Sequence, residues 1–260
     1  MNSATRQTLI EINRQFYERF AGSFSQSRSN PWRGWERLLP LLSEVSPLRV
    51  LDVGCGNGRL ASYLARARPK PFNFHGLDAS PALLRLAREQ LSEPAVQGFC
   101  DDVQLEELDV VGSTEALADL PGPYDFVALF GVLHHVPGID ARVELVRRLA
   151  ALLSPDGVLA LSCWRFDHLP RFDAKTIPWE EHNQRSTLRV DPKQLETGDY
   201  LLTWKGERET PRYCHRVSRE EANGLAEQAR LRLVDDFLAD GPGDVLNRYL
   251  VMTRPVPEVC

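Results

Sequence analysis

Between Arg49 and Trp164 the chain alternates short hydrophobic runs with amphipathic segments, and this alternation limits the fold more than any other feature. The runs RVLDVG, FNFHGLD, VQLEELDVV, YDFVALFGV and GVLALSCW have the length and composition of strands. Apolar residues at helical spacing predict helices over residues 58–67, 81–91 and 140–153. Strands and helices that alternate in this way form βαβ units, so we expect a mostly parallel sheet covered by helices on both faces.

Residues 1–47 are predicted to form a helical preamble to this core. The first helix is predicted by apolar side chains at helical spacing, which are Leu9, Ile12, Phe16 and Phe20. The polar stretch SFSQSRSNP then predicts a turn. A second short helix is expected over residues 32–42, ahead of Pro47.

The chain changes character again after the alternating region. Residues 165–217 are less regular and rich in charge, and we expect an insertion over the sheet edge rather than a separate domain. In the closing part, residues 218–260, SREEANGLAEQA predicts a helix whose capping box consists of Ser218 and Glu221. LRLVDDFL and VLNRYLVMT then predict two closing strands. We therefore expect one domain with its cofactor-binding core over residues 48–164.

The composition excludes several classes of protein. Apolar residues make up 43% of the 260 residues, and no stretch approaches the roughly 20 apolar residues of a membrane span. The first residues lack the apolar segment of a secretory signal, so we expect a cytoplasmic protein that does not engage a membrane. Five scattered cysteines without a CxxC pair indicate neither a disulfide framework nor a zinc ribbon. The net charge of −5 argues against indiscriminate nucleic-acid binding, although a local basic face is compatible with it.

The stretch VLDVGCGNGRL places Gly54, Gly56 and Gly58 directly after a hydrophobic strand and before a helix. Glycines allow a tight turn and a close approach to a ligand at the carboxyl end of the first strand, where doubly wound sheets bind cofactors. A dinucleotide-binding loop prefers the spacing G-x-G-x-x-G. Here the glycines alternate and Asp52 precedes them, so an uncharged or cationic ligand is favoured over a pyrophosphate.

Acidic residues end the next two predicted strands. Asp78 is placed where a carboxylate accepts hydrogen bonds from ribose hydroxyls, or alternatively caps the following helix, although Ser80 suits that cap better. Asp109 ends the third predicted strand and is a candidate partner for the exocyclic amine of an adenine. Asp101 and Asp102 compete for this role, but they precede the apolar run and are expected to be solvated loop acids.

Together, LDVGCGNG, the two strand-ending acids and YDFVALFGVLHH resemble the class I S-adenosylmethionine-dependent methyltransferases over residues 49–164. The resemblance implies a Rossmann-like α/β fold with a seven-stranded, mostly parallel sheet, and S-adenosylmethionine as the cofactor. In that family the glycine loop lies against the methionine and sugar, the second acid binds the ribose and the third contacts the adenine. The cofactor-binding positions implied here are Tyr17, Asp52, Gly54, Gly56, Asn57, Gly58, Asp78, Asp109, Val110 and Phe130.

The flanking segments are similar to those of the eukaryotic tRNA wobble-uridine methyltransferases, which esterify 5-carboxymethyluridine. TGDYLLTW resembles a Gly-Asp-Tyr-Leu-x-x-Trp element of that family, RYCH resembles Arg-Tyr-Tyr-His, and LNRYLVM, with Asn247, resembles its terminal strand. Thr203 and Cys214 depart from the family, which has proline and tyrosine there. In the preamble the matching residues are Tyr17, Phe24, Arg28, Pro31 and Trp32. The resemblance implies tRNA as a partner and a small zinc-binding activator subunit as another.

The expected chemistry depends on the methyl acceptor, which the fold class does not name. A carboxylate has a pKa near 4 and is already a nucleophile at neutral pH, so it needs alignment rather than a general base. For that acceptor we expect Arg212 or Arg28 to hold one carboxylate oxygen or a nearby phosphate. For an amine or hydroxyl acceptor, whichever of His134 and His135 faces the site becomes a general base, and the sequence leaves that choice open.

Two basic segments, residues 1–37 and 205–219, flank an otherwise acidic body. If they converge beside the pocket, they could follow a tRNA stem, with Trp32, Trp204 or Tyr213 stacking on an unpaired base. The alternative is that the charges are a solvated surface and the aromatic residues belong to the core.

The stretch PRYCHRV, residues 211–217, is interpreted as the lip of an acceptor pocket whose other half is GVLHHVPG. No metal site is expected there, because Cys214 and His215 are adjacent and no second ligand pair with zinc-like spacing exists. Neighbours on a strand face opposite ways, which also disfavours a Cys–His nucleophile pair. The expected acceptor-side residues are therefore Trp32, Trp204, Tyr213, His215 and Asn247.

Three hypotheses for the function follow. The first is a methyltransferase that esterifies a carboxymethyl-type wobble uridine of tRNA. The second is an O-methyltransferase of a small-molecule acid or phenol, which predicts a closed, apolar acceptor pocket. The third is a non-catalytic partner protein that binds S-adenosylmethionine, and the intact glycine loop with its acids speaks against it.

Overall fold

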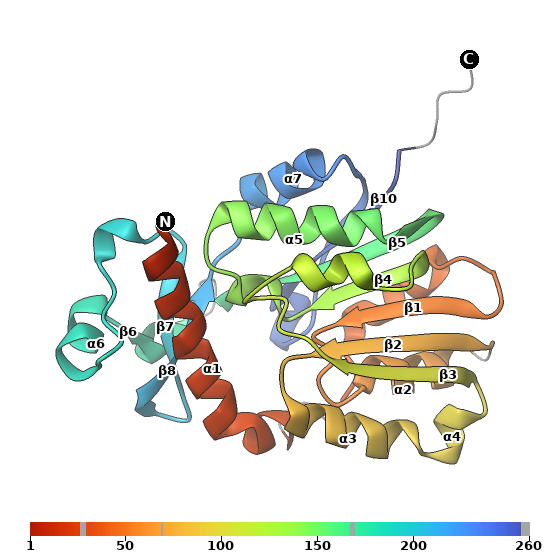
Figure 1. Ribbon diagram of the computed structural model, residues 1–260, viewed down its shortest axis with the longest axis horizontal. Helices are drawn as coiled ribbons and strands as arrows, with labels where there is room; N and C mark the ends of the chain where they lie inside the picture. The colour runs from red at the N-terminus through yellow and green to blue at the C-terminus, as the bar shows by residue number, and fades with distance from the viewer. Residues whose placement is uncertain (27–29, 69, 167–169, 256–260) are drawn as a thin grey trace.

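The computed structural model describes residues 1–26, 30–68, 70–166 and 170–255. Its main sheet has seven strands in the order β3-β2-β1-β4-β5-β10-β9. The first five of these are parallel, and β10 pairs antiparallel with both β5 and β9 (Figure 1). The strands are β1 (Leu48–Val53), β2 (Phe72–Asp78), β3 (Cys100–Glu107), β4 (Tyr124–Phe130), β5 (Leu153–Trp164), β9 (Arg232–Ala239) and β10 (Asn247–Thr253). The predicted α/β fold with a mostly parallel seven-stranded sheet is confirmed.

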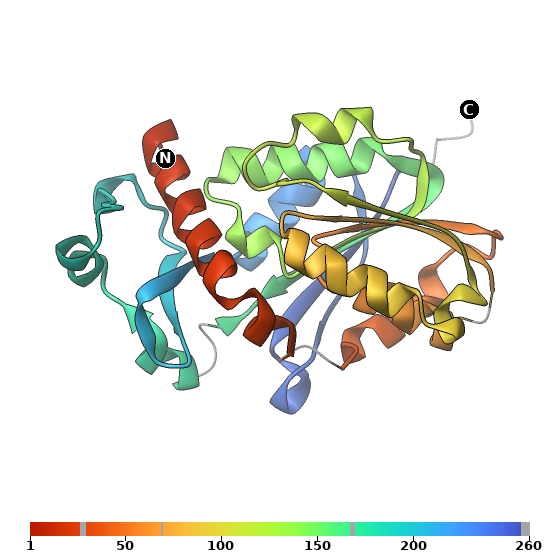
Figure 2. The same ribbon diagram turned by 60° about the horizontal axis from the view of Figure 1, so that its bottom comes forward.

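Helices cover both faces of this sheet, as the alternating pattern predicts (Figure 2). On one face α5 (Ile139–Ala151) and α7 (Arg219–Gln228) share a hydrophobic cluster with alternate residues of the central strands, such as Leu51 and Val127. The other face is covered by α2 (Arg59–Ala67), α3 (Pro81–Leu91) and α4 (Pro94–Gln97). These helices pack against the intervening residues of the same strands, such as Val50 and Phe126. Neighbouring residues of a strand point to opposite faces, so a sheet buried on both sides needs continuous apolar strands.

The long first helix, α1 (Ser3–Gln26), lies between the main sheet and a second, smaller sheet (Figures 1 and 2). The smaller sheet is antiparallel and consists of β6 (Thr176–Ile177), β7 (Asp199–Trp204) and β8 (Glu207–His215), with α6 (Trp179–Arg185) beside it. Leu9 and Ile12 of α1 pack against Ile177, Leu201 and Tyr213 of that sheet. Within the described parts of the chain, no helix combines the length and the apolar character that crossing a membrane requires.

The structure corrects the expected course of two segments. The helix α1 continues through Gln26, so half of the predicted turn SFSQSRSNP is helical, because serine and glutamine do not break a helix as proline does. The expected second helix consists instead of two 3₁₀ turns, Arg33–Arg37 and Leu39–Leu41. Gly34 packs so closely on Tyr249 that an added Cβ would lie 2.3 Å from the ring.

The third strand and the insertion also differ from expectation. β3 ends at Glu107, so Asp109 lies beyond the strand, and Asp101 and Asp102 are exposed strand residues rather than loop acids. β3 is an edge strand whose residues are mostly exposed, and charged residues are common at edges. Residues 165–217, expected to be irregular, contain the smaller sheet, whose short strands of mixed polarity give a weak periodic pattern.

Candidate functional site

A pocket of about 620 Å³ opens at the carboxyl ends of β1, β2 and β4 and is covered by α1. This volume is in the range of small-molecule sites, roughly 300–1,000 Å³. Of the predicted cofactor-binding residues, the pocket wall contains Tyr17, Asp52, Gly54, Gly56, Asn57, Asp78, Asp109, Val110 and Phe130. Residues of α1 that the sequence reasoning missed also line it, namely Ile10, Asn13, Arg14 and Glu18.

Each of the three positions in the loop requires glycine for a different structural reason. Gly54 has φ 75°, and a Cβ there would lie 2.2 Å from Val132 Cγ2. Gly56 has φ 56° and nothing within 4 Å of an added Cβ, so its backbone faces the open pocket. Gly58, which is not part of the pocket wall, precedes α2 with φ 77°, and its Cβ would lie 3.3 Å from Ala87 of α3. The loop therefore turns at Gly54, approaches a ligand at Gly56 and allows two helices to pack at Gly58.

Asp78 is held by two backbone donors. The N–H of Gly56 donates to Oδ2 and the N–H of Ser80 to Oδ1, both at 2.9 Å. Burial raises the pKa of the Asp78 carboxyl, which these two hydrogen bonds oppose. Ser80 caps α3 by accepting the N–H of Leu83 at 3.3 Å, so the role of helix cap belongs to the serine. Each Asp78 oxygen can accept a further hydrogen bond from a ligand hydroxyl.

Asp109 closes a tight turn at the opposite wall of the pocket. Its Oδ1 accepts the N–H groups of Val111 at 3.0 Å and Gly112 at 2.9 Å. Val110 between them is buried and lines the pocket. The turn fixes the position of the loop after β3.

Asp52 and Arg59 are two of the charged residues of the pocket wall. Burial, together with the charge of Asp78, raises the pKa of Asp52 to about 7, and Arg59 partly offsets this rise. The Arg59 guanidinium donates to the carbonyl of Asn30 at 2.7 Å and lies 5.2 Å from the ring centroid of Trp35. A cation at the first position of a helix opposes the helix dipole, and that anomaly is the signal in the sequence that could have identified Arg59.

His135 is the histidine that faces the pocket. Its Nε2 lies 2.8 Å from the hydroxyl of Tyr17, and its Nδ1 lies 3.0 Å from the carbonyl oxygen of Tyr213. A carbonyl oxygen only accepts, so Nδ1 carries the proton and, in the neutral ring, Nε2 accepts from Tyr17. The amide nitrogen of Asn13 is farther from Nδ1, at 3.3 Å, and the Asn13 Oδ1 accepts the N–H of Tyr213 at 2.9 Å.

His134 is not part of the pocket wall. Its ring is buried between His135, at 4.2 Å between centroids, and Trp164, at 5.4 Å. The choice between the two histidines, which the sequence left open, is decided by the 3₁₀ turn Leu133–His135. His134 therefore packs behind the pocket wall, and the catalytic role predicted for it stays a prediction.

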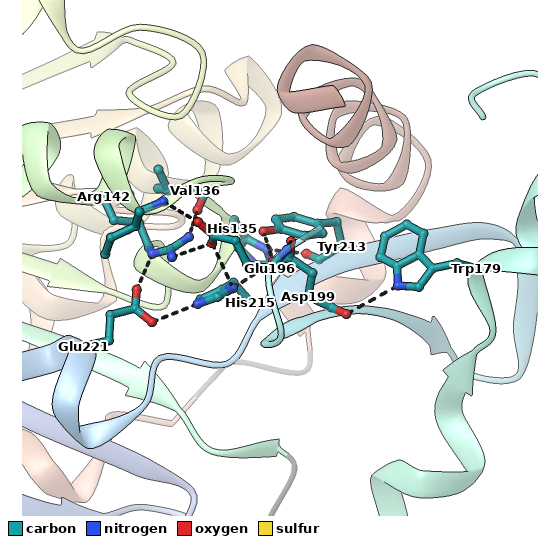
Figure 3. A network of polar contacts seen from close by, with 10 residues as sticks. His135, Val136, Arg142, Trp179, Glu196, Asp199, Tyr213, His215 and Glu221 are labelled. Carbon is teal, nitrogen blue, oxygen red and sulfur yellow. Dashed lines mark hydrogen bonds and ion pairs between the residues drawn. The ribbon is translucent and has the colours of Figure 1, made fainter. Parts of the chain in front are cut away.

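A network of buried charges lies behind His135 (Figure 3). Arg142 of α5 is 1% exposed and donates to Glu196 at 2.7 Å, to Glu221 at 2.5 Å and to the carbonyl of Val136 at 2.9 Å. Burial opposes its charge, but the two carboxylates raise the pKa of Arg142. The network joins α5, α7 and the segment before β7.

His215 occupies the centre of this network rather than an acceptor site. Its Nδ1 lies 2.7 Å from Asp199 Oδ1 and its Nε2 lies 2.9 Å from Glu221 Oε2, as Figure 3 shows. Burial lowers the pKa of His215, but the hydrogen bonds to the two carboxylates outweigh it and the net shift is upward. Tyr213 donates its hydroxyl to the same Asp199 oxygen at 2.7 Å. Both residues are fully engaged in the interior, so the prediction that they contact substrate is not supported by their burial.

Arg212 is enclosed by aromatic rings. It is 4% exposed, and its guanidinium carbon lies 4.7 Å from the ring centroid of Trp164, 5.3 Å from Phe16 and 5.8 Å from Trp204. Neither Arg212 nor Trp204 lines the pocket, which corrects the interpretation of PRYCHRV as its lip. The physical reason is that α1 covers this part of β8. Arg28, the other predicted carboxylate-binding arginine, lies outside the described residues.

The remaining predicted acceptor-side residues, Asn247 and Trp32, make contacts within the fold. Asn247 donates to Asp240 Oδ2 at 2.8 Å, and Asp240 Oδ1 accepts the N–H of Gly34 at 3.1 Å, which ties the 3₁₀ turn to β10. Trp32 packs on Phe130, 6.3 Å away between centroids, and only Phe130 of the two reaches the pocket. Neither Asn247 nor Trp32 lines the pocket, and substrate contact for them stays a prediction.

Two groups among the described residues have metal-ligand chemistry. They are His134, His135 and Cys214, and Glu196, Asp199 and His215, with ligand atoms within 4.8 Å of one another. In the second group the ligand atoms already bind Arg142, Tyr213 and each other. In the first, both ring nitrogens of His135 have hydrogen-bond partners. The geometry of neither group indicates a metal site.

Residues 24–235 match the model of a protein family described as a methyltransferase domain. The chain belongs to this family. The match covers the glycine loop, the acids and the pocket wall apart from the residues of α1, which precede residue 24. The methyltransferase family is therefore established for most of the chain.

Curated relatives of this methyltransferase include two enzymes named ubiquinone biosynthesis O-methyltransferase. The protein from Xanthomonas euvesicatoria pv. vesicatoria is 34% identical over 119 residues, which are 46% of this chain and 44% of that protein. The protein from Xylella fastidiosa strain 9a5c is 35% identical over 118 residues, 45% of this chain and 42% of that protein. The chain thus matches less than half the length of these relatives.

Solved structures share the fold. A S-adenosylmethionine-dependent methyltransferase from Clostridium acetobutylicum has 13% identity and a TM-score of 0.61, covering 92% of this chain and 99% of its own. A 1,6-didemethyltoxoflavin-N1-methyltransferase from Burkholderia thailandensis, with its substrate and S-adenosylhomocysteine bound, has 17% identity and a TM-score of 0.60, covering 98% and 92%. At these identities the likeness concerns the fold alone.

The pocket residues fit S-adenosylmethionine. The open backbone at Gly56 admits a ligand close to the loop, and both Asp78 oxygens can accept from ribose hydroxyls. The buried carboxyl of Asp52 suits a ligand that carries positive charge. When bound, this cofactor supplies an electrophilic methyl group.

Proposed function

We propose that this protein transfers the methyl group of S-adenosylmethionine to a hydroxyl oxygen of a small molecule, with a phenol as the best-suited acceptor. The observation that carries the proposal is the pair of His135 and Tyr17 at the pocket wall, with 2.8 Å between Nε2 and the hydroxyl. A phenol has a pKa near 10, so most of it is protonated at neutral pH and a base assists its attack.

His135 is suited to that role by its neighbours. Because Nδ1 donates to the carbonyl of Tyr213, the lone pair of the neutral ring is at Nε2, directed at Tyr17. The acceptor's proton would pass to the Tyr17 oxygen while the Tyr17 proton passes to Nε2. The acceptor oxygen would gain the methyl carbon, and the electron pair of the broken carbon–sulfur bond would stay on the sulfur of the departing S-adenosylhomocysteine. Histidinium is the product of this transfer, and solvent takes its proton afterwards.

The relatives support an oxygen acceptor. The curated proteins that the chain matches over about 45% of its length are named O-methyltransferases of ubiquinone biosynthesis. The buried apolar wall at Leu60 and Phe130 and the aromatic ring of Trp35 suit a flat ring better than a highly charged acceptor. A carboxylate acceptor would leave the His135–Tyr17 pair without a chemical task.

Methylation of a tRNA wobble uridine, with or without an activator subunit, stays a prediction. Some charges of the basic segments are matched by acids: Arg19 pairs with Glu207 at 3.1 Å and Arg208 with Glu181 at 2.8 Å. Arg212 is buried. These contacts reduce the positive charge that would attract RNA phosphates.

The test is methyl transfer from S-adenosylmethionine with a labelled methyl group. Purified protein is incubated with three acceptor sets: phenols and catechols, aromatic carboxylates, and tRNA from cells that lack the protein. We expect label in aryl methyl ethers, identified by mass spectrometry and resistant to mild alkaline hydrolysis. Label found only in base-labile esters or in tRNA would overturn the proposal in favour of a carboxylate acceptor.

A further inference from the structure

Tyr213 connects the buried ion network to the pocket, and all three of its polar groups are engaged. Its hydroxyl donates to Asp199 at 2.7 Å, its N–H donates to Asn13 at 2.9 Å and its carbonyl accepts from His135 at 3.0 Å. The side chain is fully buried. The position of one carbonyl oxygen, which decides where the His135 proton sits, is therefore tied to the contacts of the same residue with α1 and with Asp199 of the neighbouring strand β7, which Figure 3 shows.

The ion network holds its side chains in one mutual arrangement. Three carboxylates, of Glu196, Asp199 and Glu221, surround the Arg142 guanidinium and the His215 ring. A buried charge that loses its partner is strongly destabilised, so the ring and the carboxylates must keep their mutual positions. Their parent segments belong to α5, α7 and the smaller sheet, which are therefore locked together.

Stability alone is a weak explanation for such a cluster. A buried ion pair often stabilises a protein no better than apolar residues of the same volume, whereas it specifies one arrangement more sharply. A positioned base is sensitive to displacement, since a shift of about 1 Å can lower a rate about a hundredfold. The network lies next to His135, so its position suits the specification of one side-chain arrangement better than a gain in stability.

We propose that Asp199 and His215, acting through Tyr213, are positioning residues that fix His135 as the Nδ1–H tautomer and aim its Nε2 at Tyr17. This inference deepens the function proposed above, because it assumes that His135 is the base. Its structural part, the tautomer, can be measured without any turnover.

The test uses Tyr213→Phe, which removes the hydroxyl bond to Asp199 and keeps the carbonyl, together with Asp199→Asn. Protein labelled with ¹⁵N-histidine gives the tautomer of His135 from its ring-nitrogen shifts at pH 8, assigned with His135→Gln. We expect Nδ1–H in the wild type and a mixture of tautomers in both variants. We also expect kcat to fall about tenfold to a hundredfold, with KM for S-adenosylmethionine unchanged.

Leu145→Ala is the matched control, because Leu145 of α5 is fully buried in the main core and does not belong to the network. It should lower the stability while leaving the tautomer and kcat as in the wild type. If Asp199→Asn does not fold, Tyr213→Phe alone decides the question, since it removes one hydroxyl group.

The outcomes separate the two proposals. A wild-type tautomer in folded Tyr213→Phe would overturn the positioning role, whatever the rate. A mixed tautomer with an unchanged rate would support the positioning of His135 and overturn its role as the base. A mixed tautomer with a reduced rate, absent in Leu145→Ala, supports both.

Discussion

The carboxyl group of Asp52 is 4% exposed and lies near Asp78 and Arg59 at the end of β1. Its pKa of about 7, raised by burial and by the neighbouring acid, means that it changes charge within the physiological range. A cationic ligand favours the ionised form and should bind more tightly as Asp52 loses its proton.

We therefore expect the affinity of S-adenosylmethionine to rise by about tenfold between pH 6 and pH 8, which corresponds to about 1.4 kcal/mol. Asp52→Asn should bind more weakly at pH 8 and lose this pH dependence, as measured by isothermal titration calorimetry. Because a raised carboxyl pKa destabilises the folded protein above the pKa of the unfolded chain, the variant without ligand should also melt at a higher temperature at pH 8. A wild-type affinity independent of pH would contradict this account of Asp52.

His135→Gln tests the base directly. The variant should retain S-adenosylmethionine binding, because the other cofactor-side residues are unchanged, and lose methyl transfer to a phenol by about a hundredfold to ten-thousandfold. His182→Gln is the control, since His182 of α6 is hydrogen-bonded to the carbonyl of Leu188 and does not line the pocket. If His135→Gln is as active as the wild type, His135 is not the base.

The contact of β8 with α7 and α5 makes stability depend on pH through His215. Asp199, Glu221 and Glu196 face the ring at 2.7, 2.9 and 3.6 Å, while Arg142 opposes its charge. The folded-state pKa is raised, so the contribution of protonated His215 is full below the unfolded pKa of about 6.5 and is lost as pH rises through the folded pKa.

We expect the free energy of unfolding to decrease from pH 6 upward through this range, measured by urea denaturation at constant ionic strength. His215→Gln should be less stable at pH 6 and should show a flatter dependence on pH. A slope equal to that of the wild type would show that another group titrates. The surface pair of Arg147 and Glu144 offers a control, because exposed pairs of this kind contribute little.

The elements themselves were predicted unevenly. β1, β2 and β4 were found from the sequence because strands buried on both faces are continuously apolar, as the burial of Leu51 and Val127 shows. The edge strand β3 was predicted over residues 103–111 but spans Cys100–Glu107, and the smaller sheet escaped the same reasoning. The residues of β3 are mostly exposed, and β7 and β8 interleave charged and polar residues with apolar ones, so both depend on pairing with neighbouring strands rather than on a local pattern.

The helix α1 lies between the two sheets (Figures 1 and 2) and covers the pocket at the edge of the main sheet. Its buried face packs Leu9 and Ile12 on the smaller sheet, and the adjacent Asn13 and Tyr17 line the pocket. Cofactor binding should therefore depend on the docking of this helix.

Leu9→Ala removes a fully buried side chain from that contact and should destabilise the protein by about 2–5 kcal/mol. We also expect a lower affinity for S-adenosylhomocysteine and faster amide exchange in α1, measured below the melting transition. Leu145→Ala should cost about as much stability without weakening the ligand. Equal losses of affinity in the two variants would show that the pocket does not require α1.

The sequence by itself determined the cofactor side of the site. Asp52, Gly56 and Asp78 lie at or just after the carboxyl ends of buried strands. Parallel strands bring their carboxyl ends to one edge of the sheet, so the order of these residues along the chain was enough to predict that they lie together. The tertiary structure alone decided the acceptor side. Asn13 meets Tyr213 across 200 positions of the chain and His135 across 122, and α1 buries Arg212. Such contacts arise from packing between distant segments, and no local pattern of residues encodes which side chains that packing leaves facing the pocket.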